Sequence, residues 1–194
     1  MMMRLLLLWL ALQSVTAGPA WTLAYEGRST NDIVWDKRMR PLVNTRVPAK
    51  LSYELLHALG GPPDPVLVKD HRYVSVSACV AHACGVKGFF WIDVKTGVGL
   101  GAVALTTFDH LEADSLRLGS NGLSPTRIPA AARDALIDWL SEKELTPEHV
   151  DFIGSQGESL SLDASAFKPH VRYEPAGGPS FDCARASGVV ARNV

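Results

Sequence analysis

Apolar and polar residues alternate through the middle of the chain, and this pattern predicts a β-sheet. Over residues 72–78, valine or alanine at every second position is separated by tyrosine or serine. Successive side chains of a strand point to opposite faces, so this segment presents one apolar and one polar face. Strands are predicted at residues 65–68, 72–78, 86–94, 98–107 and 115–118. Tight turns between them predict an antiparallel meander of about five strands.

A different spacing of apolar residues, every three to four positions, predicts helices before the strands. Residues 29–40 begin with four good capping residues, and Pro41 is expected to end this helix. A second helix opens at Pro48, because proline is favoured in the first turn, and Gly60 and Gly61 end it. Its buried face is expected to consist of Leu51, Leu55 and Leu59.

A third helix is predicted after the strands, at residues 129–143, with Pro129 in its first turn. Its apolar stripe consists of Ala132, Leu136, Trp139 and Leu140. Residues 147–153 are left unassigned. Helices flanking an antiparallel sheet make this an α+β fold, which we expect to occupy residues 18–167 as one domain.

Residues 1–17 have the organisation of a secretory signal peptide. Arg4 supplies a positive charge, residues 5–12 form an apolar run, and Ala17 ends a small-residue cleavage site. The apolar run is too short to span a bilayer, so no membrane anchor is expected. We therefore expect a mature chain beginning at Gly18 in an oxidising compartment, where cysteines tend to pair.

Composition and charge narrow the classes of function. Of the 194 residues, 47% are hydrophobic and 20% are charged, and the mean hydropathy is +0.08. These values are typical of a globular domain and exclude a disordered chain or a protein with several membrane spans. The net charge of −1 gives no basic excess, so nucleic acid is not an expected partner. No set of residues assembles a catalytic site, so we expect neither enzymatic activity nor a cofactor.

The most informative segment lies between two predicted strands, at residues 77–85. Cys79 and Cys84 are five positions apart and flank His82, while the other residues between them are small and apolar. In an exported protein, two cysteines across a folded-back connection can close a small ring. Such a ring would hold a protruding loop in one shape and reduce the ordering cost of binding. The same Cys-x-x-His-x-Cys spacing offers three zinc ligands, and a metal site is the alternative interpretation.

The segment Ser-Ala-Cys-x-x-His-x-Cys-Gly resembles the loop sequence of the family named after the inhibitor of vertebrate lysozyme (Ivy). Members of this family are periplasmic proteins. The resemblance covers about residues 48–107. It implies a three-layer α+β fold, a periplasmic location and a disulfide between Cys79 and Cys84. It also implies that residues 79–84 form an inhibitory loop, whose His82 enters the active-site cleft of a C-type lysozyme and hydrogen-bonds the catalytic carboxylates.

The loop departs from the family's usual Cys-Lys-Pro-His-Asp-Cys sequence at three positions. Val80, Ala81 and Ala83 stand where the family has lysine, proline and aspartate. The expected partner is a C-type lysozyme. The alternative function is that of a periplasmic binding module for a lytic transglycosylase or for peptidoglycan. Dimers occur in the resembled family, which leaves a homodimer as an open expectation.

The C-terminal segment contains two further expected parts. Residues 168–178 are rich in proline and glycine and are predicted to form a linker. Residues 179–194 resemble the start of the LprI-type lysozyme-inhibitor domain, a small helical module with paired cysteines. The chain ends before the second cysteine of that module, so Cys183 is an unpaired cysteine. This cysteine indicates either a truncated domain or a disulfide between chains.

Overall fold

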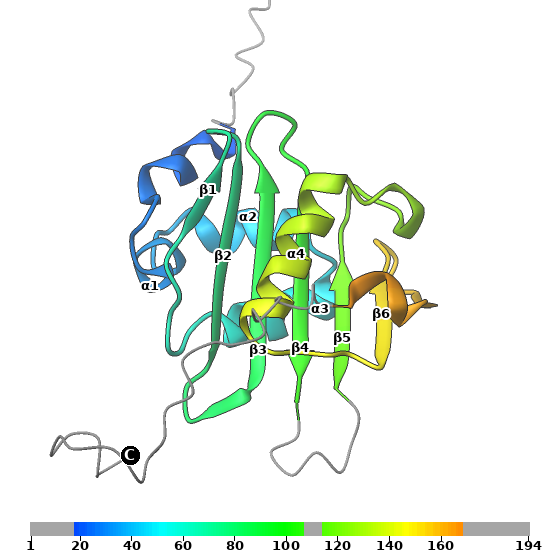
Figure 1. The fold of residues 1–194 in the computed structure, drawn as a ribbon. Helices are drawn as coiled ribbons and strands as arrows, with labels where there is room; N and C mark the ends of the chain where they lie inside the picture. Colours follow the sequence, from blue (N-terminus) through cyan, green and yellow to red (C-terminus); the bar gives the residue numbers. More distant parts are fainter. Residues whose placement is uncertain (1–17, 107–113, 169–194) are drawn as a thin grey trace, which may run out of the picture.

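The computed structural model describes residues 18–106 and 114–168, which form one sheet with helices on both faces (Figure 1). The α-helices are α1 (Thr30–Val34), α2 (Met39–Arg46), α3 (Ala49–Ala58) and α4 (Ala130–Glu142). The strands are β1 (Leu67–Lys69), β2 (Tyr73–Val80), β3 (Ala83–Asp93), β4 (Gly99–Leu105), β5 (Ser115–Gly119), β6 (His149–Ile153) and β7 (Ser159–Leu162). Short 3-10 helices are η1 (Pro19–Tyr25), η2 (Pro125–Arg127) and η3 (Ala164–Phe167). The fold is therefore α+β, as predicted.

The sheet has seven strands in the order in which they occur along the chain. β1 to β5 form the predicted antiparallel meander. β6 then pairs in parallel with β5, and β7 pairs antiparallel with β6. A parallel neighbour requires a crossover connection, and α4 lies in that connection. The expected number of about five strands was wrong because β6 and β7 were missed. β6 joins the sheet in parallel through α4, so no tight turn precedes it, and β7 is mostly exposed, which leaves little hydrophobic pattern.

Alternate residues of the strands face two separate apolar cores. Phe89 and Trp91 of β3 pack on the side of α4, whereas Phe90 and Ile92 pack on the side of α1, α2 and α3. The molecule therefore has a helix layer, a sheet and a second helix layer. In Figure 1, α4 lies in front of the sheet and α2 and α3 lie behind it. The predicted apolar face of α3 is buried in the second core at Leu51, Leu55 and Leu59.

Glycines in the sheet let α3 lie unusually close to it. A Cβ atom added at Gly101 of β4 would lie 2.7 Å from Cδ2 of Leu55. One added at Gly88 of β3 would lie 2.9 Å from Cβ of Ala58. Real Cβ atoms are essentially never this close to other atoms. Only glycine at these two positions therefore allows α3 to pack this closely against the sheet.

The helix predicted at residues 29–40 is divided in two. α1 ends at Val34, and α2 begins at Met39 after a turn that contains Trp35. Pro41 therefore lies in the first turn of α2 and does not end a helix, which corrects the prediction. The first-turn position suits proline because the amide hydrogens there have no partner within the helix.

Several expectations fall outside the described residues. They are the signal peptide at residues 1–17, most of the linker at residues 168–178, the segment 179–194 and Cys183. The other predicted strands and the third helix agree with β1 to β5 and α4 to within a few residues. Within the two described ranges, no helix is long and apolar enough to cross a membrane.

Candidate functional site

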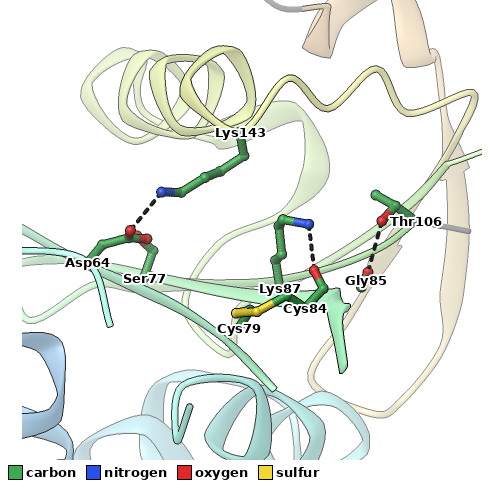
Figure 2. The surroundings of a disulfide bond; sticks show 8 residues. All are labelled: Asp64, Ser77, Cys79, Cys84, Gly85, Lys87, Thr106 and Lys143. Carbon is green, nitrogen blue, oxygen red and sulfur yellow. Dashed lines mark hydrogen bonds and ion pairs between the residues drawn. A yellow bond between two sulfur atoms is a disulfide. The ribbon is translucent and has the colours of Figure 1, made fainter. Parts of the chain in front are cut away.

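The two cysteines lie at the tip of the hairpin formed by β2 and β3. Val80 of β2 pairs with Ala83 of β3, so only Ala81 and His82 form the turn. The Cα atoms of Cys79 and Cys84 are 4.9 Å apart and their sulfur atoms are bonded, as Figure 2 shows. The predicted disulfide is therefore present. We call residues 79–84 the disulfide loop.

An irregularity in the strand pairing shapes this loop. Cys79 pairs with Lys87, whereas the next residue, Val80, pairs with Ala83. Residues 84–86 of β3 consequently have no partner on β2 and form a bulge. Bulges bend a strand and redirect its side chains, and they are common beside functional sites. The disulfide crosses this bulge and joins the two arms of the hairpin at its most irregular point.

Hydrogen bonds from neighbouring residues hold the bulge in place (Figure 2). The backbone N–H of Thr106 donates to the Gly85 carbonyl at 2.8 Å, and its hydroxyl donates to the same oxygen at 3.3 Å. The Lys87 ammonium donates to the Cys84 carbonyl at 2.6 Å. Burial lowers the pKa of Lys87, and nearby Lys143 lowers it further, against an opposing effect of Asp114. The Gly85 carbonyl is thus satisfied by the residue that follows β4, and the Cys84 carbonyl by a side chain of β3 itself.

His82 is at the exposed end of the loop. Its backbone φ is +62°, in the left-handed region, where histidine is more frequent than most residues with a β-carbon. Among the described residues, nothing hydrogen-bonds its imidazole. A neutral imidazole offers one donor and one acceptor. The tip therefore presents both functions of a single side chain to a partner.

The remaining loop residues differ in exposure. Ala81 is exposed like His82, whereas Ala83 and Cys84 are half-buried. Val80 is 8% exposed and belongs to the base of the loop. The structure thus brings the predicted site residues together, but Val80 is a packing residue and not part of the protruding tip.

Gly61 supports the base of the loop from behind. A Cβ atom at this position would clash with the Cys79 carbonyl oxygen and would lie 2.5 Å from the Ala81 nitrogen. The next residue, Pro62, accepts a hydrogen bond from the Cys79 N–H at 3.3 Å. The loop therefore rests directly on the backbone that follows α3.

A polar cluster ties this same segment to α4 (Figure 2). Lys143 donates to Asp64 at 2.6 Å, and the Ser77 hydroxyl donates to the other carboxylate oxygen at 2.6 Å. Burial tends to lower the pKa of Lys143, but the hydrogen bonds to Asp64 and Glu142 outweigh it and the pKa is raised. The ammonium remains charged, so it links the front helix layer to the edge of β2.

The metal interpretation receives no geometric support. Both sulfur atoms of the Cys-x-x-His-x-Cys sequence are in the disulfide, so neither is a thiolate ligand in this state. Residues 18–106 and 114–168 contain no group of three or more His, Cys, Asp or Glu side chains placed to hold a metal ion.

Sequence reasoning did not identify the residues that position the loop. Gly61 was interpreted only as the end of a helix, and the contacts of Lys87 and Thr106 depend on a bulge that the alternating pattern does not reveal. A signal was present for Gly61, since two successive glycines exceed what a helix end requires. No such signal marks Lys87 or Thr106.

Comparison with known proteins gives no further support for an assignment. The chain significantly matches no protein-family model, no curated protein and no solved structure.

Proposed function

We propose that this protein is a periplasmic inhibitor of C-type lysozyme, of the Ivy type, that acts by inserting the disulfide loop into the active-site cleft. The observation that supports it most directly is the imidazole of His82, which is exposed at the end of a cross-linked turn and has no hydrogen-bond partner among the described residues. The signal-peptide pattern of residues 1–17 and the resemblance at residues 179–194 point to the same compartment and the same class of target.

The chemistry of the target suits this side chain. Lysozyme cleaves its substrate with two carboxyl groups in one cleft, one protonated and one ionised. A neutral imidazole donates a hydrogen bond to the ionised carboxylate and accepts one from the protonated acid. His82 would thereby engage both catalytic groups while the loop excludes the polysaccharide.

Rigidity of the loop supports tight binding. The disulfide, the Thr106 and Lys87 hydrogen bonds and the contact with Gly61 fix the backbone before a partner arrives. A pre-ordered loop loses less conformational entropy on binding than a flexible one. The small side chains of Ala81 and Ala83 keep the tip narrow, which favours entry into a cleft.

The first test compares wild type with His82→Ala and His82→Asn in the inhibition of a C-type lysozyme acting on bacterial cell walls. Asparagine accepts left-handed backbone readily, so His82→Asn preserves the turn and replaces the imidazole with a shorter carboxamide, whose donor and acceptor do not reach as far into a cleft. We expect both variants to raise the inhibition constant at least about 30-fold, as for a hot-spot contact of about 2 kcal/mol.

Any of three results would contradict the proposal. The wild-type protein could fail to inhibit lysozyme, both variants could inhibit as strongly as wild type, or the loop of the purified protein could contain two reactive thiols. Wild type that fails on lysozyme but inhibits a lytic transglycosylase would assign the loop to that enzyme class. Circular dichroism of the variants verifies that the fold is retained.

A further inference from the structure

The exposed part of the disulfide loop is too small to account for a stable protein complex. Within the loop, only Ala81 and His82 are exposed, with Ala83 and Cys84 half-buried. Specific protein interfaces bury about 800 Å² on each partner and use about 20–30 residues a side. A partner that takes the loop must therefore contact the surface beside it as well.

A hollow of about 700 Å³ adjoins the loop. Val80 and Ala81 form one wall, and the turn between α1 and α2 and the outer face of α3 form the others. Trp35 and Tyr53 line it, and each is 78% exposed. We call this surface the aromatic hollow. Ala81 belongs both to the wall of the aromatic hollow and to the tip of the disulfide loop. A protein bound to the loop tip therefore also faces the hollow.

The side chains of the aromatic hollow are those that dominate protein interfaces. Tryptophan, tyrosine and arginine are the residue types most enriched among interface hot spots. Lys37, Arg40 and His57 also line the hollow. In the described parts of the chain, neither Lys37 nor Arg40 forms an ion pair. Of the lining residues that the structure describes, only Asp36 carries a carboxylate, and it is paired with Arg38. The rim therefore favours a partner surface that carries carboxylates beside an apolar projection.

The turn that carries Trp35 is fixed before binding. Asp36 accepts hydrogen bonds from the Arg38 side chain at 2.6 and 2.9 Å and from the Arg38 backbone N–H at 2.8 Å. The Tyr25 hydroxyl donates to the same carboxylate at 2.8 Å. These bonds, led by the Arg38 side chain, hold the pKa of Asp36 well below its ordinary value.

Tyr53 is equally well positioned. It lies on the face of α3 opposite to Leu51 and Leu55, which are buried against the glycines of the sheet. This packing holds the backbone that carries Tyr53, just as the hydrogen bonds of Asp36 hold the backbone that carries Trp35. Aromatic side chains have only two rotatable χ angles, so on such a backbone they contribute contact area at low entropic cost.

We propose that the aromatic hollow and the disulfide loop form one composite surface for a single partner, the wall-cleaving enzyme of the proposed function. His82 enters the catalytic cleft, while a carboxylate-bearing, partly apolar lip of that cleft occupies the hollow. This inference rests on the proposed function and adds the second contact region.

The test measures association and dissociation rates of immobilised C-type lysozyme with wild type, Trp35→Ala and Tyr53→Ala. Leu160→Ala is the matched control, because Leu160 is also exposed, at 54%, but lies on β7 at the opposite edge of the sheet from β1. We expect each aromatic variant to dissociate at least about tenfold faster with a nearly unchanged association rate. The control should behave as wild type.

A second variant tests the charges of the rim. Lys37→Gln combined with Arg40→Gln should slow association and reduce its dependence on salt, because rim charges act mainly on the encounter rate. Association and salt dependence like those of wild type would show that the lip carries no complementary carboxylates and would overturn that part of the proposal.

The outcomes separate this inference from the function on which it rests. If wild type inhibits and His82→Ala does not, but the aromatic variants bind like wild type, the composite surface is wrong and the inhibitor function stands. If wild type does not bind lysozyme, both fail together. If Trp35→Ala loses binding to soluble peptidoglycan fragments while inhibition is unchanged, the hollow is a glycan site and the inference is overturned.

Discussion

Gly61 allows the disulfide loop to rest directly on the backbone that follows α3. It has no side chain, and the space that one would occupy is filled by backbone atoms of Cys79, Val80 and Ala81. Backbone does not yield as the end of a flexible side chain does. A substitution here must displace either the loop or the segment that follows α3.

We therefore expect Gly61→Ala to weaken both the fold and inhibition. Overpacking should cost about 1–3 kcal/mol of unfolding free energy, and displacement of the tip should raise the inhibition constant at least about tenfold. Urea unfolding and inhibition assays measure the two effects. Gly122→Ala is the control, because the nearest atom to its added methyl group, on Val98, is 3.9 Å away. Equal potency of Gly61→Ala and wild type would show that the loop does not depend on this contact.

At the scale of elements, the hairpin of β2 and β3 has a regular middle, which belongs to the sheet, and a specialised tip. Its middle is paired residue by residue, whereas its tip is bulged and cross-linked. The closed ring is short, and loop-closure entropy then gives a stabilisation of about 2 kcal/mol. The disulfide should consequently matter more for the shape of the tip than for the existence of the fold.

Cys79→Ser combined with Cys84→Ser tests this division. We expect the circular dichroism spectrum to be retained and the unfolding free energy to fall by about 2 kcal/mol. The free energy of binding to lysozyme should fall by more than the unfolding free energy does, because an untethered loop must be ordered on binding. Complete unfolding of the double variant would show instead that the bond is required by the fold. Cys183→Ser serves as the background, so that no other thiol complicates the measurement.

Much of this arrangement follows from the sequence at the level of elements. Alternation located β2, runs of strand-forming residues and tight turns located β1 and β3 to β5, and apolar spacing located α3 and α4. The break at Trp35 was missed because it depends on Asp36 bonding the turn, not on a loss of apolar spacing. The cysteine pair marked the loop, but nothing in the sequence places Trp35 or Tyr53 beside it, since only packing of the helix layer does so.

On the scale of the whole molecule, the opposite end of the same hairpin stabilises the fold. Arg72, just before β2, donates two hydrogen bonds to Asp93 at the end of β3, at 2.7 and 2.8 Å. Asp93 also accepts from the Thr96 hydroxyl and the Lys95 N–H. The Arg72 side-chain hydrogen bonds are the largest cause of its pKa lying well below 3.8, against the opposing effect of burial.

This pKa shift predicts how stability depends on pH. A carboxyl group with a lowered pKa in the folded state stabilises the fold above its unfolded pKa of about 4, and the contribution disappears as pH falls further. Asp93→Asn should lose about 2 kcal/mol at pH 7 and should show a smaller drop in unfolding free energy between pH 5 and pH 2 than wild type. Urea titrations across that range measure both. Parallel pH curves for the two proteins would contradict the prediction.

Residues 62–64, which lie beside β2, also limit how a partner can recognise this molecule. Pro62 accepts from the Cys79 N–H, the Asp64 N–H donates to the Ser77 carbonyl, and Pro63 forms an isolated bridge with Ala78. β1 continues the cover along the rest of the strand. The outer edge of the hairpin is thus already occupied, and it is partly lined by proline, which lacks an amide hydrogen. A foreign strand therefore cannot pair with β2 by β-augmentation, and β1 is the edge strand on this side of the sheet. Selectivity at this edge therefore rests on side-chain chemistry and shape, and edge-to-edge aggregation through the hairpin is suppressed.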